Sequence, residues 1–304
     1  MIDTPAPATP ALRPAGRRVL LVALVPLAAV TWWLVGALPE LLDRVSDAVT
    51  GLGEQSTDPW NTGSGSSMTT LPLAGASLGL LVPNSLLGGL LAGLLGRLAR
   101  GERRATVAGA TLGGLALALT VVLLGAAADP EGLASFPFGT RYGAGLVAGM
   151  VLATLAGWFL GSCALVGRSG TGIALGAVAG ALPVWLGGLA LAVVDVSSLG
   201  PSFDLRWTAW VGAAFLALAL VIVGVEPLPR LAWWPLVVVV TWTVLPLVWA
   251  AAFQLIGAGS TVPHLLWDGV LNQARQIFPW LVPVVVAAGV SLLRSRASGA
   301  DRPS

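Results

Sequence analysis

The chain has 304 residues, of which 56% are hydrophobic and only 10% are charged, and its formal net charge is +2. Soluble domains carry about 25% charged residues, and a globule of this length could not bury so much apolar surface, because a large part of any globule stays exposed. The composition therefore excludes a soluble globular protein and predicts an all-α, polytopic bundle of membrane-spanning helices.

A helix needs about 20 apolar residues to cross the hydrocarbon core of a bilayer. The sequence offers eight such stretches, and every Arg, Asp, Glu and His side chain lies outside them. The predicted spans are 19–38, 70–96, 105–128, 143–166, 172–194, 207–225, 233–256 and 277–293. Together they form one transmembrane domain, 19–293, between a disordered N-terminal tail, 1–18, and a C-terminal tail, 294–304.

Charges are distributed unequally between the two sides that these spans define. With the N-terminus in the cytoplasm, 12 of the 16 basic residues fall inside and 10 of the 14 acidic residues fall outside. Cytoplasmic loops are enriched in positive charge, so both termini are predicted to be cytoplasmic. Every basic residue is Arg, and because Arg codons are GC-rich, this bias indicates a bacterial genome and a bacterial plasma membrane.

Two of the outer connections have the pattern of a helix lying on the membrane surface. Apolar residues recur every three or four positions in 39–52 and again in 262–278, with polar residues on the opposite face. This pattern predicts two interfacial amphipathic helices. Tryptophans at the span ends are predicted to form an interfacial belt. They include Trp32, Trp33, Trp207, Trp233, Trp234 and Trp280.

Small residues are predicted to hold the bundle together, because lipid tails are as apolar as Leu and close contact between helix backbones must provide the attraction. Glycines recur along 143–166 and 172–194, and Gly109 and Gly113 form a shorter run in the third span. The predicted helix-packing residues are Gly145, Gly149, Gly157, Gly161, Gly172, Gly176 and Gly180. We therefore expect the second to fifth spans to form the packed centre and the last three to lie at the periphery. The alternative is that these glycines line a pore or a sliding interface.

Near the middle of the second span lie Pro83 and Asn84. Proline removes one backbone hydrogen bond from a helix, and lipid offers an amide no partner. Asn84 is therefore expected to point into the bundle and to bond either a neighbouring helix or the carbonyl that Pro83 frees. Two interpretations stay open: a hydrogen bond that only packs helices, or a binding residue that contacts a substrate at a broken helix.

Two further groups of polar residues lie outside the spans. His264 and Asp268 are one helical turn apart and could bind a metal or polarise a water, but two ligands are too few for a metal site, and a solvated helix face is the alternative. The second group follows the second span and consists of Arg97, Arg100, Arg103 and Arg104. This cluster is interpreted as a topology signal that attracts anionic lipid, or as a docking site for a membrane or cytoplasmic protein partner.

The predicted spans contain no carboxylate, no His and no nucleophile paired with a base, so the residues needed for proton-coupled transport or intramembrane proteolysis are missing from them. No cofactor, metal or nucleic-acid partner is predicted. The leading interpretation is a non-catalytic scaffold or an accessory subunit of an envelope or transport assembly. The main alternative is a permease for a neutral or lipidic substrate, with a path between 70–96 and 172–194. An outward-facing enzyme that uses His264 is a more distant alternative.

Overall fold

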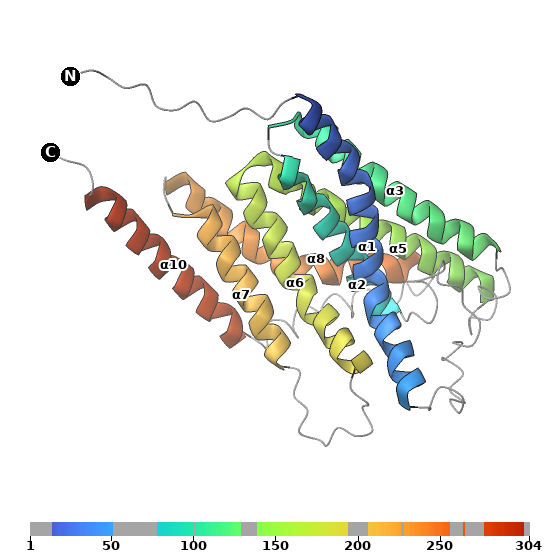
Figure 1. Cartoon of the computed structure of the whole chain (residues 1–304). Helices are drawn as coiled ribbons and strands as arrows, with labels where there is room; N and C mark the ends of the chain where they lie inside the picture. Colours follow the sequence, from blue (N-terminus) through green and yellow to red (C-terminus); the bar gives the residue numbers. More distant parts are fainter. Residues whose placement is uncertain are drawn as a thin grey trace.

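The computed structural model describes residues 14–50, 78–99, 101–128, 139–193, 206–225, 228–255, 264 and 277–300. Every element in these ranges is a helix (Figure 1). The elements are α1 (Pro14–Thr50), α2 (Leu78–Leu95), η2 (Gly96–Ala99), α3 (Arg104–Ala128), α5 (Gly139–Ser162), η3 (Cys163–Val166), α6 (Arg168–Val193), α7 (Arg206–Val223), η4 (Leu228–Ala232), α8 (Trp233–Leu255) and α10 (Ile277–Ala300).

Seven helices in the described part of the chain are long and apolar enough to cross a membrane, which indicates a multi-pass membrane protein. They correspond in order to the first seven predicted spans. The eighth predicted span lies in α10, whose described apolar stretch, Leu281–Ser291, is shorter than the other seven. Helix α10 packs against α7 and runs alongside it (Figure 1).

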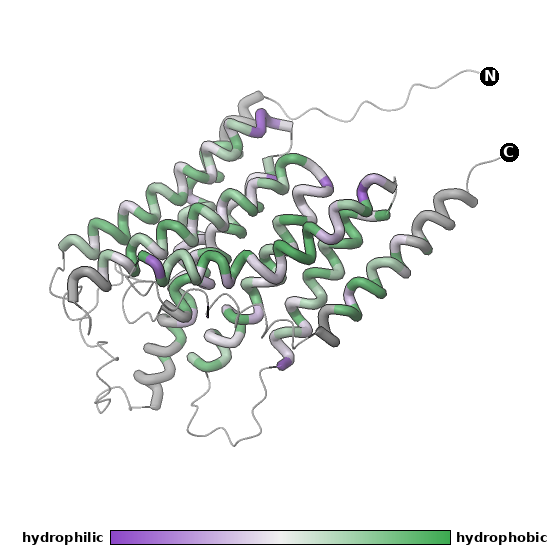
Figure 2. Tube along the Cα trace, turned by 180° about the vertical axis from the view of Figure 1, so that it is seen from behind, coloured by the Kyte–Doolittle hydropathy of each residue, from purple (hydrophilic) through white to green (hydrophobic). Residues whose placement is uncertain are grey.

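Successive helices run in alternating directions, so the connections gather at two ends of the bundle (Figure 1). One end holds the start of α1 and the end of α10. The same end holds the α2–α3, α5–α6 and α7–α8 connections. This arginine end carries Arg97, Arg103, Arg104, Arg168 and Arg230. Figure 2 shows that the strongly hydrophilic residues lie near helix ends, whereas the middle of each helix is apolar or neutral.

Helix α1 differs from the sequence-based expectation, because the first span and the predicted surface helix 39–52 are one continuous helix that ends at Thr50. Pro39 lies inside it. A proline in a helix removes one backbone bond and does not have to end the helix when another donor reaches the freed carbonyl. The second predicted surface helix, 262–278, lies mostly outside the described residues.

The two tails are also shorter than expected. Helix α1 begins at Pro14, within the predicted tail 1–18, and α10 continues to Ala300, beyond the predicted boundary at 293. Proline suits the first turn of a helix, where its missing N–H has no intrahelical partner to lose. The apolar stretch of a sequence locates the part of a helix that lipid can surround. The helix itself can be longer, because its backbone hydrogen bonds continue through the polar residues that flank the apolar stretch.

Helix α2 forms the centre of the bundle. In its span, 72% of the residues are buried, against 28–50% in the other six. It packs most extensively against α5 and also contacts α1, α6 and α8. The expected centre is therefore partly wrong, because α3 lies at the edge against α1, and α8, expected at the periphery, packs against α5 and α6. Composition shows that a span has small residues, but not whether they face a neighbouring helix.

Candidate functional site

Asn84 lies in the interior, between α2 and α1. The expected position near the middle of the span is wrong, because the described span is Leu80–Ala99 and Asn84 is only about one turn from its first residue. Its side chain is 5% exposed, and Nδ2 donates a hydrogen bond to the carbonyl oxygen of Gly36 in α1 over 3.4 Å. The predicted inward orientation is therefore confirmed, and the partner is a neighbouring helix. The Oδ1 atom of Asn84 and the adjacent Ser85 hydroxyl are buried and have no hydrogen-bond partner among the described residues. All residues of 81–90, including Pro83, are buried.

A second polar contact lies beside the first, where Pro39 interrupts the hydrogen bonding of α1. Pro39 has no N–H, so the carbonyl of Val35, four residues earlier, loses its intrahelical donor. The indole N–H of Trp185 in α6 donates to this carbonyl over 2.9 Å. Side chains from α6 and α2 thus bond two successive carbonyls of α1. We call Val35, Gly36, Pro39, Asn84 and Trp185 the proline junction.

Two tryptophans of the predicted interfacial belt are interior residues. Trp32 is fully buried, and its indole N–H donates to the Thr154 hydroxyl in α5 over 2.9 Å. Trp234 is 8% exposed and donates to the carbonyl oxygen of Gly224 over 3.1 Å. Trp207 and Trp233, by contrast, are exposed, as expected for a belt.

A glycine seam joins α2 to α5. A Cβ atom added at Gly157 or Gly161 would collide with backbone oxygens of Leu86 and Leu90 in α2. In the opposite direction, a Cβ atom at Gly93 would lie 2.7 Å from the backbone oxygen of Trp158 in α5. The two backbones are therefore as close as glycine allows, and bulk at either helix would separate them.

The other predicted packing glycines are also inside the bundle. Gly145 and Gly149 are buried in α5. The α6 glycines face α7 and α8: a Cβ atom at Gly176 would lie 2.9 Å from Val237, and one at Gly180 would collide with the Thr241 carbonyl oxygen. A Cβ atom at Gly172 would collide with Val223 in α7. Their role in holding the bundle stays a prediction, with the mutational test given below.

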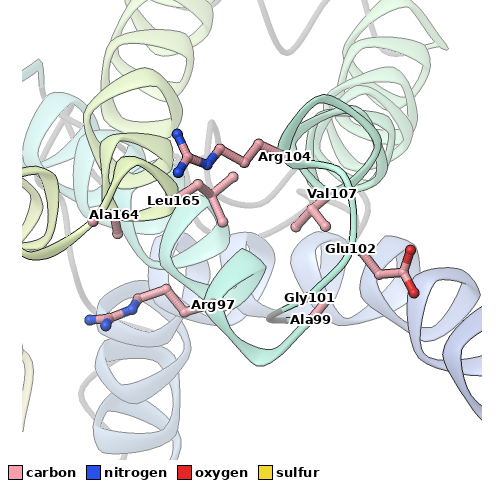
Figure 3. A pocket seen from close by; sticks show the side chains of 9 residues that line it. Arg97, Ala99, Gly101, Glu102, Arg104, Val107, Ala164 and Leu165 are labelled. Atoms are coloured by element: carbon pink, nitrogen blue, oxygen red, sulfur yellow. The ribbon is translucent and has the colours of Figure 1, made fainter. Parts of the chain in front are cut away.

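Part of the predicted Arg cluster lies around a cavity of about 250 Å³ at the arginine end (Figure 3). Arg97 and Arg104 lie on opposite sides of Leu165, and the carboxylate of Glu102 points away from both guanidinium groups. Arg103 is exposed and does not line this cavity. Arg100 lies outside the described residues. The exposed positive charge suits an anionic group.

A second cavity, of about 570 Å³, lies on the other side of η3 and is also lined by arginines, Arg168 and Arg230. Neither cavity includes Asn84 or Pro83 in its lining. Both open at the arginine end, and the described mid-depth part of α2 is occupied by packed side chains. Sequence reasoning did not single out this second pair, because its two members lie in separate connections.

His264 is exposed. Asp268 lies outside the described residues, so the proposed pairing of the two stays a prediction. The described residues contain no group of three His, Cys, Asp or Glu side chains that could hold a metal ion.

No family model, no curated protein and no solved structure matches the chain. Its geometry provides buried hydrogen-bonding groups, which join α1 to α2 and α6, and arginines around two cavities at one end. The first arrangement can hold helices together, and the second can attract anions.

Proposed function

We propose that the chain is a non-catalytic protein of the bacterial plasma membrane that acts as a scaffold or as an accessory subunit of an envelope or transport assembly. It crosses the membrane eight times, with α10 as the last span, and both termini are cytoplasmic. The even count is supported by α1 beginning and α10 ending at the same end of the bundle (Figure 1). The orientation is supported by the Arg residues at that end.

The observation that carries the scaffold role is the packing around α2. This helix bears the buried amide, yet its residues 81–90 are all buried, and its backbone touches that of α5 along the glycine seam. A substrate path between α2 and α6 beside Asn84 would have to displace these packed side chains. Both described cavities lie at the arginine end, where a partner can reach them. We place the docking site for a membrane or cytoplasmic protein at Arg97, Arg100, Arg103 and Arg104.

One observation favours the alternative, a permease for a neutral or lipidic substrate. The Asn84 Oδ1 atom and the Ser85 hydroxyl are buried without a partner among the described residues. Buried polar groups are nearly always hydrogen-bonded, and a passing substrate could supply the missing bonds. In that role, α2 would part from α6 during transport.

Two variants separate these functions in a strain that lacks the gene and shows a growth or uptake defect. As a scaffold, the protein should lose complementation in R97Q/R104Q at normal abundance. Asn84→Leu should then cost only about 1 kcal/mol of stability and complement in proportion to the amount of protein. As a permease, it should lose complementation in Asn84→Leu at normal abundance and keep it in R97Q/R104Q. Complementation and membrane abundance are measured together for each variant.

The orientation can be tested with single cysteines in a Cys163→Ala background. His264→Cys and Arg103→Cys are suitable because both positions are exposed; Gly101 is less suitable, because its φ of 103° disfavours any side chain. In intact cells, an impermeant maleimide should label His264→Cys but should label Arg103→Cys only after permeabilisation. Labelling of Arg103→Cys in intact cells would show that the arginine end faces outward.

A further inference from the structure

The larger of the two cavities brings together charges from separate parts of the chain. Arg168 begins α6, and Arg230 lies in η4, immediately before α8. Both line the same cavity of about 570 Å³, together with Ser169. Two arginines and a serine from separate parts of the chain therefore line one space at the arginine end of the bundle.

The remaining wall of this cavity is apolar and faces outward. Val166 is 66% exposed and Trp233 is 41% exposed, and Ile173 of α6 also lines the cavity. Exposed Trp at the end of a span is typical of the boundary between headgroups and acyl chains. The lining therefore combines two arginines with exposed apolar side chains at the end of the bundle, the combination that suits a phospholipid where it changes from polar to apolar.

We propose that this cavity binds a phosphate group between Arg168 and Arg230, either the phosphate of an anionic phospholipid headgroup or a free phosphate ion. Guanidinium groups donate paired N–H bonds to phosphate oxygens, and such charge-assisted bonds are the strongest hydrogen bonds that side chains form. The volume exceeds what one phosphate requires. The apolar wall at Val166 and Trp233 suits the glycerol and first acyl carbons of a lipid.

The test uses the full chain purified in dodecyl maltoside. It is titrated with dioctanoyl phosphatidylglycerol, with dioctanoyl phosphatidylcholine and with inorganic phosphate; native mass spectrometry counts bound lipid, and thermal unfolding reports all three ligands. R168Q/R230Q should weaken phosphatidylglycerol binding by about tenfold or more, since each Arg near an anionic lipid contributes about fivefold. The matched control is R206Q, which removes an exposed Arg at the start of α7, outside the arginine end and outside both cavities. It should change the affinity by less than about twofold.

The ligand series identifies the source of the phosphate. If inorganic phosphate displaces phosphatidylglycerol and loses its effect in R168Q/R230Q, the site takes free phosphate as well as lipid. If only the lipid depends on these arginines, the ligand is the headgroup.

Three results would overturn the proposal: equal binding of phosphatidylcholine and phosphatidylglycerol, unchanged affinity in R168Q/R230Q, or an equal loss in R206Q. Should the double variant aggregate, R168Q alone replaces it with an expected loss of about fivefold. An unchanged affinity in R168Q would then refute the site.

Discussion

Gly157→Ala is expected to destabilise the bundle by about 1–3 kcal/mol or more, although Ala is intrinsically the better helix former. A Cβ atom at this position would collide with the carbonyl oxygen of Leu86 and lie 2.9 Å from the backbone nitrogen of Leu90. Both are backbone atoms of α2, and unlike a flexible side chain they cannot turn aside. The two helices must move apart, and contacts along the whole glycine seam weaken with distance.

The control for this variant is Gly113→Ala in α3, the same chemical change in another span. Nothing lies within 4 Å of a Cβ atom added at Gly113, and the residue is exposed. The variant should therefore be neutral, or more stable by at most about 1 kcal/mol. The free energy of unfolding of both variants is measured by reversible unfolding with dodecyl sulfate in mixed micelles, followed by circular dichroism. Equal stability of the two variants would mean that the seam is looser than described.

Local properties of the chain were predicted well because lipid imposes strict local requirements. A span must be apolar for its whole length, so hydropathy alone locates seven helices. An amide within a membrane span must find a partner inside the protein, so the orientation of Asn84 followed from its chemistry. The sequence did not identify the partner of this amide. Any unbonded carbonyl on a neighbouring helix would accept its hydrogen bond as well as the carbonyl of Gly36 does.

The proline junction shows what sequence reasoning missed. Pro39 frees the carbonyl of Val35 by a local rule, and that carbonyl could have been named from the sequence. Its donor, Trp185, is 150 residues away. Only the packing of α6 against α1 brings the Trp185 indole to the Val35 carbonyl. Other tryptophans in the sequence also have an indole N–H, so the sequence alone could not identify the donor.

The direction in which a residue faces was the least predictable property. Gly113 and Gly157 occur in similar small-residue patterns, yet the first faces open space and the second faces a backbone. Trp32 and Trp207 both lie near the end of a predicted span, yet only Trp207 is exposed. In a bilayer both faces of a helix are apolar, so the hydrophobic pattern that orients helices in soluble proteins carries little information here.

Trp32→Ala is expected to be among the most damaging single substitutions, with a loss of about 3–5 kcal/mol of stability. The indole is fully buried between helices and is hydrogen-bonded to Thr154 in α5. Gly88 of α2 makes room for it, because a Cβ atom there would lie 2.9 Å from Cδ1 of the ring. Removing the ring thus leaves a cavity where α1, α2 and α5 meet, and lipid chains have no access to fill it.

Trp207→Ala removes the same side chain from an exposed position at the start of α7, where lipid can replace the lost contacts, and should cost less than about 1 kcal/mol. The hydrogen bond is separated from the packing by a double-mutant cycle with Trp32→Phe and Thr154→Val, which should show a coupling of about 0.6–1.7 kcal/mol. Zero coupling would refute the indole–hydroxyl bond, whereas equal losses in Trp32→Ala and Trp207→Ala would refute the interior position of Trp32. Because α1 also carries the carbonyls bonded by Asn84 and Trp185, loss of the Trp32 contact should already weaken the proline junction, and Trp32→Ala combined with Asn84→Leu should therefore cost less than the sum of the two.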